Sequence, residues 1–576
     1  MAFTVIFFAM GVLMFKHIFF RCFVGFHGIF LLFPDCLMQD FTASPFSPQN
    51  PFLWISNAPT ELCDERHNIK IDMSLFPLTG SPRKNVIKQG ILIFYFDKLG
   101  YYPYIDSRTG DSVNGGIPQL GCLQKHLDKA ALDIAYYIGP NNVGLAVIDW
   151  QEWRPIWERN WSPKHIYRDI SIDLIRQQNV TLPLNNATNI AKGEFETAGK
   201  TFMLETLKLG KSLRPKYLWG FYRFPECYNT HYKKAGYNGS CVYLEMKRND
   251  HLGWLWNEST ALYPSIYLNT DVKNSRYAAL FVRNRVREAL RVSKVRNHTD
   301  PLPVFAYLRP VFADKSDRFL SKDDLVDTIG ESMALGVSGM VIWGGYNLSR
   351  TMEVCQSFDT FMQDLLNPYI INVTLAAKMC SQVLCKEKGV CVRRDWNSSD
   401  YLHLNPKSFV IQPVKGGKYT VHGKPTLEDL QQFSKKFHCS CYSNINCVTT
   451  VDVNTTNYTY VCVGNDVCIN ALINPKLSGP SDWNKRRSIA YGNVSFSSPL
   501  ARASPCVSGK DLNENPKTKC LVEALSNNLQ EDSQSHLYIQ DNKNEITSSS
   551  TSSVLIKFPI YILHGFFAFT FLYLAI

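Results

Sequence analysis

Short apolar runs alternate with longer amphipathic stretches between residues 91 and 371, and this alternation is the strongest constraint on the fold. The runs that we interpret as strands are 91–96, 144–149, 217–224, 303–309 and 339–343. Helices, or helix ends, are predicted at 133–138, 165–178, 194–209 and 275–296. Strands that alternate with helices favour a parallel sheet, and a segment of this length fits a (β/α) barrel of the α/β class. Because a chain of 576 residues exceeds the roughly 250–300 residues of one core, further domains are expected.

The predicted strand at 144–149 runs directly into Asp149, Trp150, Gln151 and Glu152. Acidic and aromatic side chains just beyond a buried strand are costly to bury for packing alone. At the carboxyl end of a barrel strand they point to chemistry. Alternate residues of a strand share a face, so Asp149 and Gln151 are expected to enter one cavity while Glu152 points away. The alternative is a strand end capped by an incidental aspartate.

A glycosidase uses two carboxyl groups in such an arrangement. One group protonates the leaving oxygen, and the other stabilises the nucleophile or acts as one. Here the second position is Gln151, whose amide cannot donate a catalytic proton. The pattern therefore predicts sugar chemistry with one of its two groups replaced.

The pattern Asp-aromatic-Glu-x-Trp-Arg is the catalytic signature of animal hyaluronidases, and this chain resembles that family, above all its sperm-surface, lipid-anchored members. The resemblance runs from about 51 to about 473. It includes the stretches at 99–106, 115–120, 207–229, 254–268, 336–345 and 367–385. It implies a distorted (β/α) barrel over 51–371, a hyaluronan or chondroitin-type substrate, and no cofactor or metal. The family has Glu where this chain has Gln151.

The resemblance also assigns roles to single residues. In a substrate-assisted mechanism the sugar's own acetamido oxygen attacks the anomeric carbon, Asp149 orients the acetamido N–H, and Tyr222 bonds the carbonyl oxygen. Gln151 takes the general-acid position. Substrate-binding positions are Trp150, Glu226, Tyr263, Arg285 and Trp343. An ordinary strand tyrosine is the alternative for Tyr222, and a core tryptophan is the alternative for Trp343. Trp153 and Arg154 are expected to complete the cleft, with Arg154 paired beneath the strand.

Loss of the proton donor divides the functional hypotheses. General acid catalysis contributes about 10²–10⁴-fold, so turnover is expected to fall by that order. Glu152 would replace the donor only if a bulge or turn redirected it. One hypothesis is an endo-β-N-acetylhexosaminidase. The other is a glycan-binding or adhesion protein with the same fold and little turnover. A third, weaker idea is that Gln151 is a sequencing or allelic oddity.

Cysteines and glycosylation sequons indicate an oxidising, secretory route. The 17 cysteines are many for a cytosolic protein. Asn-x-Ser/Thr begins at many positions, among them Asn179, Asn186, Asn238, Asn257, Asn297, Asn347, Asn372, Asn397, Asn454, Asn457 and Asn493. One sequon is a weak signal, whereas this number together with the cysteines favours secretion.

Six closely spaced cysteines predict a disulfide-stapled module over 379–473, because so short a segment cannot bury a large core. Spacing alone leaves the pairing open. The family pattern implies an EGF-like arrangement and these pairs: Cys380–Cys391, Cys385–Cys439, Cys441–Cys447, Cys462–Cys468, Cys63–Cys355 and Cys227–Cys241. A zinc site is disfavoured because the Cys-x2-Cys spacing is missing. Cys506 and Cys520 are candidates for a further pair, and Cys122 has no assigned partner.

Both ends of the chain predict a cell-surface protein. Residues 1–38 are interpreted as a long signal peptide, with an uncleaved anchor as the alternative. Residues from about 40 to 60 are rich in Pro and Ser, and this composition predicts a loose N-terminal arm. A polar stalk over 474–553 leads to the apolar tail 554–576, which fits a GPI-attachment signal. The alternative for the tail is a short transmembrane helix.

The basic charge is compatible with an acidic partner. The net charge of +11 suits an acidic polymer or an anionic surface, with simple solubility as the equal alternative. The stretch 281–296 carries six basic residues, among them Arg285, on a helical pattern. It is interpreted more readily as a solvated face than as a glycan contact. No nucleic-acid partner is predicted.

Overall fold

A computed structural model of the chain describes residues 52–82, 86–414, 418–442, 445, 447, 453–464 and 466–473. They all lie within one compact unit, Met1–Ser498, whereas the second unit, Pro499–Ile576, lies outside the described residues. The predicted signal peptide, stalk and lipid-attachment tail, with Cys506 and Cys520, also lie outside them. Of the helices in the described ranges, none is both long and apolar enough to cross a membrane.

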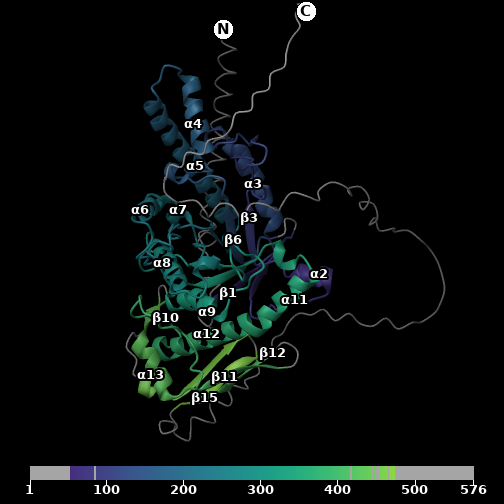
Figure 1. Ribbon diagram of the computed structural model, residues 1–576, viewed down its shortest axis with the longest axis vertical. Coiled ribbons are helices and arrows are strands. Elements are labelled where there is room, and N and C mark those ends of the chain that lie inside the picture. Colours follow the sequence, from purple (N-terminus) through teal and green to yellow (C-terminus); the bar gives the residue numbers. More distant parts are fainter. Residues whose placement is uncertain are drawn as a thin grey trace, which may run out of the picture. The chain divides into compact units, whose positions relative to one another are not determined.

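Seven parallel strands in the described residues form two sheets, and Figure 1 labels β1, β3 and β6 among them. The first has the order β2-β1-β9-β8, with bounds Leu78–Gly80, Leu53–Asn57, Gly339–Trp343 and Phe305–Leu308. The second has the order β3-β6-β7, with bounds Ile91–Tyr95, Gly144–Asp149 and Tyr217–Phe221. The predictions at 144–149 and 339–343 match their strands residue for residue. The other three predicted runs are one to three residues too long.

The two sheets are connected on both sides. Isolated parallel bridges join Tyr222 to Tyr263 and Ser265 to Tyr307, so the extended segment 261–265 lies between β7 and β8. On the other side, the Gly90 N–H donates to the Thr79 carbonyl at 3.0 Å, next to β3 and β2. Within the described residues the strands therefore follow one another in parallel without forming a single continuous sheet.

Helices separate the strands along the chain, which confirms the α/β class. Up to β9 they are α2 Glu61–His67, α3 Leu123–Tyr137, α4 His165–Gln178, α5 Leu184–Leu213, α6 Tyr243–His251, α7 Gly253–Glu258, α8 Arg276–Ser293, α9 Lys322–Leu325 and α10 Glu331–Ala334. The prediction at 165–178 matches α4, and that at 194–209 lies inside the longer α5, which packs beside α4 (Figure 1). Helix α8 starts where the Ser275 hydroxyl accepts the Tyr277 N–H, a typical N-cap.

The parallel strands separate two hydrophobic clusters. Leu145 and Val147 of β6 belong to an inner cluster, whereas Ala146 and Ile148 belong to an outer one under the helices. The same alternation recurs along β1, β3, β8 and β9. The buried inner side chains of these strands and of β6 are Leu53, Ile55, Ile91, Ile93, Leu145, Val147, Phe305, Tyr307 and Val341. An alternate residue at the carboxyl end of each strand therefore faces the same interior.

The prediction of a loose arm over about 40–60 is wrong for its last third. Residues Leu53–Asn57 form β1, which is fully buried and pairs with both β2 and β9. Strand β1 has only five residues and follows a Pro- and Ser-rich segment. Composition averaged over about twenty residues does not detect so short an element.

The C-terminal region contains three antiparallel pairs of strands. These are β10 Gly389–Arg393 with β13 Phe437–Cys441, β11 Phe409–Val414 with β12 Lys418–Gly423, and β14 Tyr458–Val463 with β15 Val467–Leu472. Helices α11 Met352–Phe361, α12 Asn367–Cys380 and α13 Leu427–Lys436 accompany them, and short strands β4 Tyr104–Ile105 and β5 Ser112–Val113 pair elsewhere.

Helix α12 runs without interruption across the predicted boundary between 371 and 379, and its buried side chains join the outer cluster on both sides.

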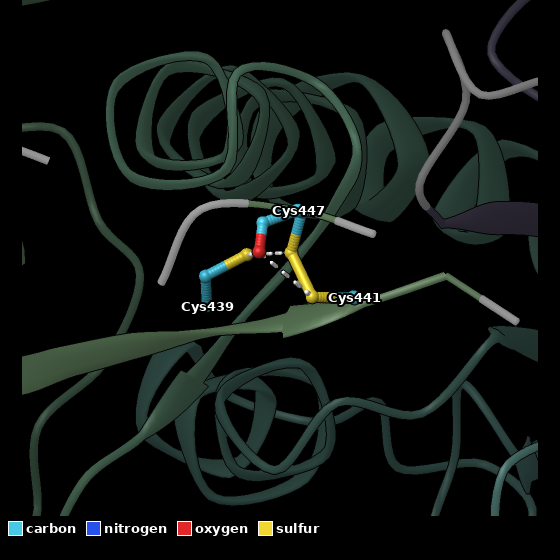
Figure 2. A group of neighbouring side chains, drawn as sticks. All are labelled: Cys439, Cys441 and Cys447. Carbon is cyan, nitrogen blue, oxygen red and sulfur yellow. Dashed lines mark hydrogen bonds between the residues drawn. A yellow bond between two sulfur atoms is a disulfide. The ribbon is translucent and has the colours of Figure 1, made fainter. Parts of the chain in front are cut away.

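Six disulfides lie in the described residues, and their pairs are those that the family pattern implies. Three sulfur atoms, of Cys439, Cys441 and Cys447, come within 4.8 Å of one another (Figure 2). Each of the three belongs to a disulfide, so this group offers no thiolate to a metal ion. Cys122 is exposed and unpaired.

A buried charge cluster connects α8, α10 and β10. The Glu331 carboxylate, fully buried, pairs with Arg283 at 2.6 Å and with Arg393 at 3.0 Å. The Tyr401 hydroxyl donates to it at 3.0 Å. Because Arg393 belongs to the cysteine-rich region and Arg283 to the α/β region, the cluster holds the two regions together.

Asp327, one helical turn before Glu331, predicts a pH-dependent stability. Burial, together with the charge of Glu331, raises the pKa of Asp327 from 3.8 to about 7. The folded protein therefore holds this proton more tightly, and the resulting stabilisation is fully present below about pH 3.8 and lost as the pH rises through about 7. Asp327→Asn is expected to raise the free energy of unfolding at pH 8 by about 1–2 kcal/mol, less than the full shift because the carboxyl is half-buried.

Denaturant unfolding of both proteins at pH 4 and pH 8 measures this difference. The gain should be confined to pH 8, where the parent carboxyl is ionised. An equal gain at both pH values would show that the aspartate charge is not its cause.

Candidate active site

The carboxyl ends of the parallel strands bring polar and aromatic side chains to one edge of the interior. Tyr95 ends β3 and stands opposite Asp149, which ends β6, in the strand register. Tyr222 and Arg309 follow β7 and β8, and Trp343 ends β9. All continue the inward-facing alternation of their strands. This edge is where α/β proteins with parallel strands place their ligands.

Asp149 and Gln151 meet as the strand alternation predicts. The Gln151 Nε2 donates to Asp149 Oδ1 at 2.7 Å, and the Asp149 side chain is largely buried. A carboxylate only accepts hydrogen bonds, so the amide must present its nitrogen to Asp149. Its oxygen therefore points the other way.

Arg223 fixes the other end of this amide, and the sequence analysis missed it. Its Nη1 donates to Gln151 Oε1 at 3.2 Å, and its Nε lies 3.8 Å from a carboxylate oxygen of Glu226. The backbone of Arg223 has a positive φ of 70°, which turns the chain sharply after β7. The available signal was a lone cation between aromatic residues at the end of a predicted strand, in Tyr222-Arg223-Phe224.

Glu226 is enclosed by cations instead of facing a ligand. Its carboxylate pairs with Arg154 at 3.2 Å and Arg159 at 3.9 Å, and Tyr228 donates to it. Burial acts to raise the pKa of Glu226, but Arg154, Arg159 and Arg223 outweigh it and lower that pKa to about 2. The prediction that Glu226 binds substrate is therefore corrected: it anchors the arginines below Gln151. Arg154 is paired beneath the strand, as expected.

Glu152 lies apart from Asp149. Its Oε2 accepts the Gln151 backbone N–H at 3.1 Å, and burial raises its pKa against the opposing charge of Lys164. Lys164 donates to the carbonyl oxygens of Gln151 and Glu152, and burial together with the charge of Arg154 lowers the pKa of Lys164 to about 7. Glu152 and Lys164 therefore stabilise the turn that presents Gln151.

Tyr222 keeps its proton beside Asp149. Its hydroxyl donates to the Ser265 hydroxyl at 3.4 Å. Burial, reinforced by the Asp149 charge, raises the pKa of Tyr222 to about 12. Tyr222 is thus a hydrogen-bond donor over the physiological pH range.

Trp343 is half-buried among polar and aromatic groups. Its Nε1 donates to the Tyr95 hydroxyl at 3.4 Å, and its ring stacks on that of Tyr267 with centroids 6.1 Å apart. Tyr267 in turn lies 6.2 Å from the Tyr222 ring. A partly exposed aromatic surface next to Asp149 and Tyr222 suits the apolar face of a sugar.

Three further predicted positions lie elsewhere than expected. Trp150 faces the outer cluster, 4.6 Å from the Tyr102 ring, because strand alternation directs it opposite to Asp149, and Trp153 packs against the same tyrosine. Tyr263 is fully buried below the site, and its hydroxyl donates to the Leu218 carbonyl. The expectation that these three line a cleft is therefore wrong.

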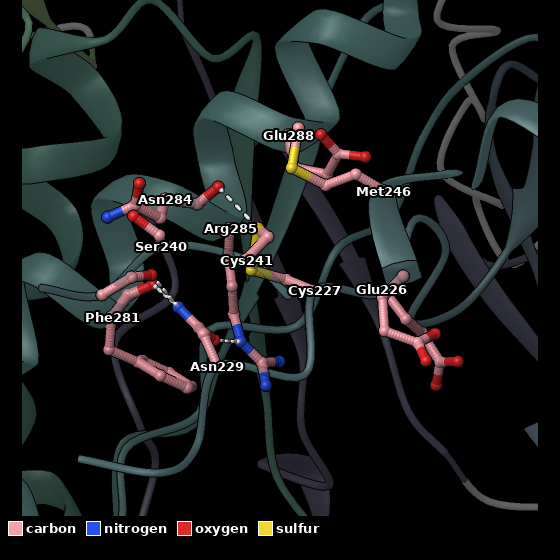
Figure 3. Close-up of a disulfide and its surroundings, with 12 residues drawn as sticks. Glu226, Cys227, Asn229, Ser240, Cys241, Met246, Phe281, Asn284, Arg285 and Glu288 are labelled. Atoms are coloured by element: carbon pink, nitrogen blue, oxygen red, sulfur yellow. Dashed lines mark hydrogen bonds between the residues drawn. A yellow bond between two sulfur atoms is a disulfide. The ribbon is translucent and has the colours of Figure 1, made fainter. Parts of the chain in front are cut away.

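Arg285, on α8, contacts the segment that carries Ser265. Its Nε donates to Asn229 Oδ1 at 2.9 Å and its Nη1 donates to the Ser265 carbonyl at 2.9 Å. Figure 3 shows the Asn229 contact close to the Cys227–Cys241 disulfide. Arg285 therefore orients the segment that carries Ser265, the partner of Tyr222.

The arrangement combines one carboxylate, one protonated phenol and one amide at a half-buried edge. The carboxylate and phenol can orient a polar ligand group by hydrogen bonds. The amide can donate a hydrogen bond but has no proton to transfer at accessible pH.

Comparison with known proteins identifies the family. The family described as Hyaluronidase matches residues 41–452. Hyaluronidase PH-20 of Homo sapiens is 61% identical over 474 residues, which cover 81% of this chain and 93% of the relative. Hyaluronidase-5 of Mus musculus is 54% identical over 510 residues, which cover 87% and 97%. The crystal structure of bee venom hyaluronidase is 30% identical, covers 55% of this chain and 99% of its own, and has a TM-score of 0.48. The resemblance inferred from the motif at 149–154 is confirmed, and the chain belongs to the hyaluronidase family of glycoside hydrolases.

Proposed function

We propose that this chain binds hyaluronan, or a chondroitin-type polymer, at the carboxyl ends of its parallel strands and hydrolyses it slowly. The family match supports the reaction class, an endo-β-N-acetylhexosaminidase with a substrate-assisted, retaining mechanism. Asp149 accepts the acetamido N–H of the sugar at the cleavage point. Tyr222, which stays protonated, donates to the acetamido carbonyl oxygen and steadies it as it attacks the anomeric carbon.

The contact between Gln151 Nε2 and Asp149 at 2.7 Å carries the second half of the proposal. It supports the assignment of an amide to the position where the reaction needs an acid to protonate the leaving oxygen. Departure of an unprotonated sugar oxygen is slow, so binding persists while turnover falls by about 10²–10⁴-fold.

A second candidate is a cell-surface glycan-binding or adhesion protein. It is favoured by the same amide, whose two ends are already hydrogen bonded to Asp149 and Arg223. In that case the site serves recognition alone, and no cleavage accompanies binding.

One experiment distinguishes the two candidates. The full chain, purified from mammalian cells, is assayed for hyaluronan binding and for new reducing ends from pH 4 to pH 8, beside Asp149→Asn. Slow cleavage that Asp149→Asn abolishes supports the weak enzyme, whereas tight binding with no cleavage at any pH supports the binding protein. Absence of binding would reject both.

We further propose the architecture that surrounds this site. The parallel strands of residues 51–371 form a distorted (β/α) barrel, and 379–473 form an EGF-like module whose disulfides support that view. The sequence of the tail 554–576 supports a GPI anchor on the outer cell surface, reached through a signal peptide at 1–38 and a stalk at 474–553. Release of the protein from cells by a phosphatidylinositol-specific phospholipase tests the anchor.

A further inference from the structure

Arg309 is a buried cation at the edge of the candidate site. It follows β8, where Phe305 and Tyr307 face the inner cluster and Ala306 and Leu308 the outer one. Two-residue alternation places Arg309 on the inner face. Arg309 is only 8% exposed.

No anion in the described part of the chain balances this charge. The Arg309 Nε is buried and has no hydrogen-bond acceptor, and no described carboxylate forms an ion pair with the guanidinium. The other buried arginines differ in this respect. Each pairs with a glutamate: Arg154 with Glu226, Arg159 with Glu245, and Arg283 and Arg393 with Glu331.

Two aromatic rings hold the guanidinium in place. Its central carbon lies 5.2 Å from the Trp343 ring centroid and 5.7 Å from that of Tyr267. Such cation–π contacts attract and orient a guanidinium, but they leave its charge and its N–H donors uncompensated. Burial of a charge without a counter-ion is unfavourable, so an anionic ligand would be strongly preferred here.

The same two rings connect Arg309 with Asp149 and Tyr222. Trp343 donates to Tyr95, whose strand register sets it opposite Asp149. Tyr267 neighbours Tyr222 at 6.2 Å between ring centroids. Arg309 therefore contacts two rings, Trp343 and Tyr267, each of which also neighbours a residue beside the groups proposed to hold the acetamido sugar.

We propose that Arg309 binds the carboxylate of the uronic acid next to the N-acetylhexosamine held by Asp149. Hyaluronan and chondroitin carry one carboxylate on every second sugar, and a guanidinium matches a carboxylate with two parallel hydrogen bonds. The inference rests on the proposed function and adds to it the group by which the polymer is recognised. It makes Arg309 a determinant of specificity for acidic glycans.

The test compares hyaluronan octasaccharide with the same octasaccharide after reduction of its carboxyl groups to alcohols. Calorimetric titration of the full-length parent is expected to show binding about 10- to 100-fold weaker for the reduced sugar, as for loss of a charged hydrogen-bonded pair. Arg309→Gln is expected to bind the acidic sugar as weakly as the parent binds the reduced one, and to bind both sugars equally. Unsulfated chondroitin octasaccharide, with the same carboxylates, shows which polymer is preferred.

Matched variants separate recognition from folding. Arg176→Gln removes the same charge from an exposed position of α4 and should keep the parent's full preference for the carboxylate. Arg309→Lys keeps the charge but loses the planar fork, so it should retain only part of the preference, and it replaces Arg309→Gln if that variant does not fold. An Arg309 variant that discriminates between the two sugars as strongly as the parent overturns the inference. If the parent binds the acidic and the reduced sugar equally well, the inference is overturned but the proposed function is left intact. If the parent binds neither sugar, both the inference and the proposed function are overturned.

Discussion

Gln151→Glu is expected to raise the hyaluronan turnover of this protein by about 10²–10⁴-fold. The new carboxyl would occupy the position of the amide, within hydrogen-bond distance of Asp149. Two carboxyl groups so close do not both ionise, so the pair retains one proton and can deliver it to the leaving oxygen. The measurement is the rate of appearance of reducing ends at saturating hyaluronan, for parent and variant, from pH 4 to pH 8.

Arg223 sets the pH range of that gain. It donates to the oxygen end of the amide, so it would favour the ionised form of a glutamate there and oppose Asp149. Gln151→Glu combined with Arg223→Gln is therefore expected to stay active at higher pH than Gln151→Glu alone. A pH profile unchanged by Arg223→Gln would show that Arg223 does not act on the acid.

Two controls belong with this prediction. Gln151→Ala should not gain activity, because it introduces no proton donor. Glu152→Gln should leave the gain of Gln151→Glu in place, since Glu152 lies apart from Asp149 beside the Lys164 turn. If Gln151→Glu turns over within about tenfold of the parent, the missing acid is not what limits this protein.

Glu331→Gln is expected to lower the free energy of unfolding by about 3–5 kcal/mol, because it leaves two buried arginines without a counter-charge. Arg283 and Arg393 lie at 2.6 and 3.0 Å from the carboxylate, and all three residues are almost completely buried. Denaturant unfolding with intact disulfides measures the loss. Glu428→Gln, at an exposed glutamate in the first turn of α13, is the matched control and should change stability by less than about 1 kcal/mol. A Glu331→Gln loss no larger than the control's would mean that neither arginine depends on this carboxylate.

The parts of the fold that the sequence predicts are those where a local pattern suffices. The strand 144–149 is a continuous apolar run ended by an acid, and α4 is a regular amphipathic stretch, so both were located to the residue. Strand β1 was missed because its burial comes from β2 and β9, which lie far away in the sequence.

The candidate site shows the same division. Alternation along β6 predicts that Asp149 and Gln151 meet. The same alternation directs Trp150 to the outer cluster, although the family motif includes Trp150. Arg223 and Arg309 were missed because their importance depends on neighbours. Arg223 matters through an amide 72 positions away, and Arg309 through the lack of a glutamate that the other buried arginines possess.

The continuity of α12 has a consequence for how this protein evolves and is engineered. Its buried side chains Ile370, Ile371, Met379 and Cys380 all belong to one hydrophobic cluster, which includes residues of the parallel strands and of the cysteine-rich region. Separable domains meet at exposed linkers crossed by few contacts. Here the two regions meet at a buried helix, α12. Grafting the cysteine-rich region of a relative onto this chain would thus require matching one shared helix side chain by side chain, so the two regions are constrained to diverge together.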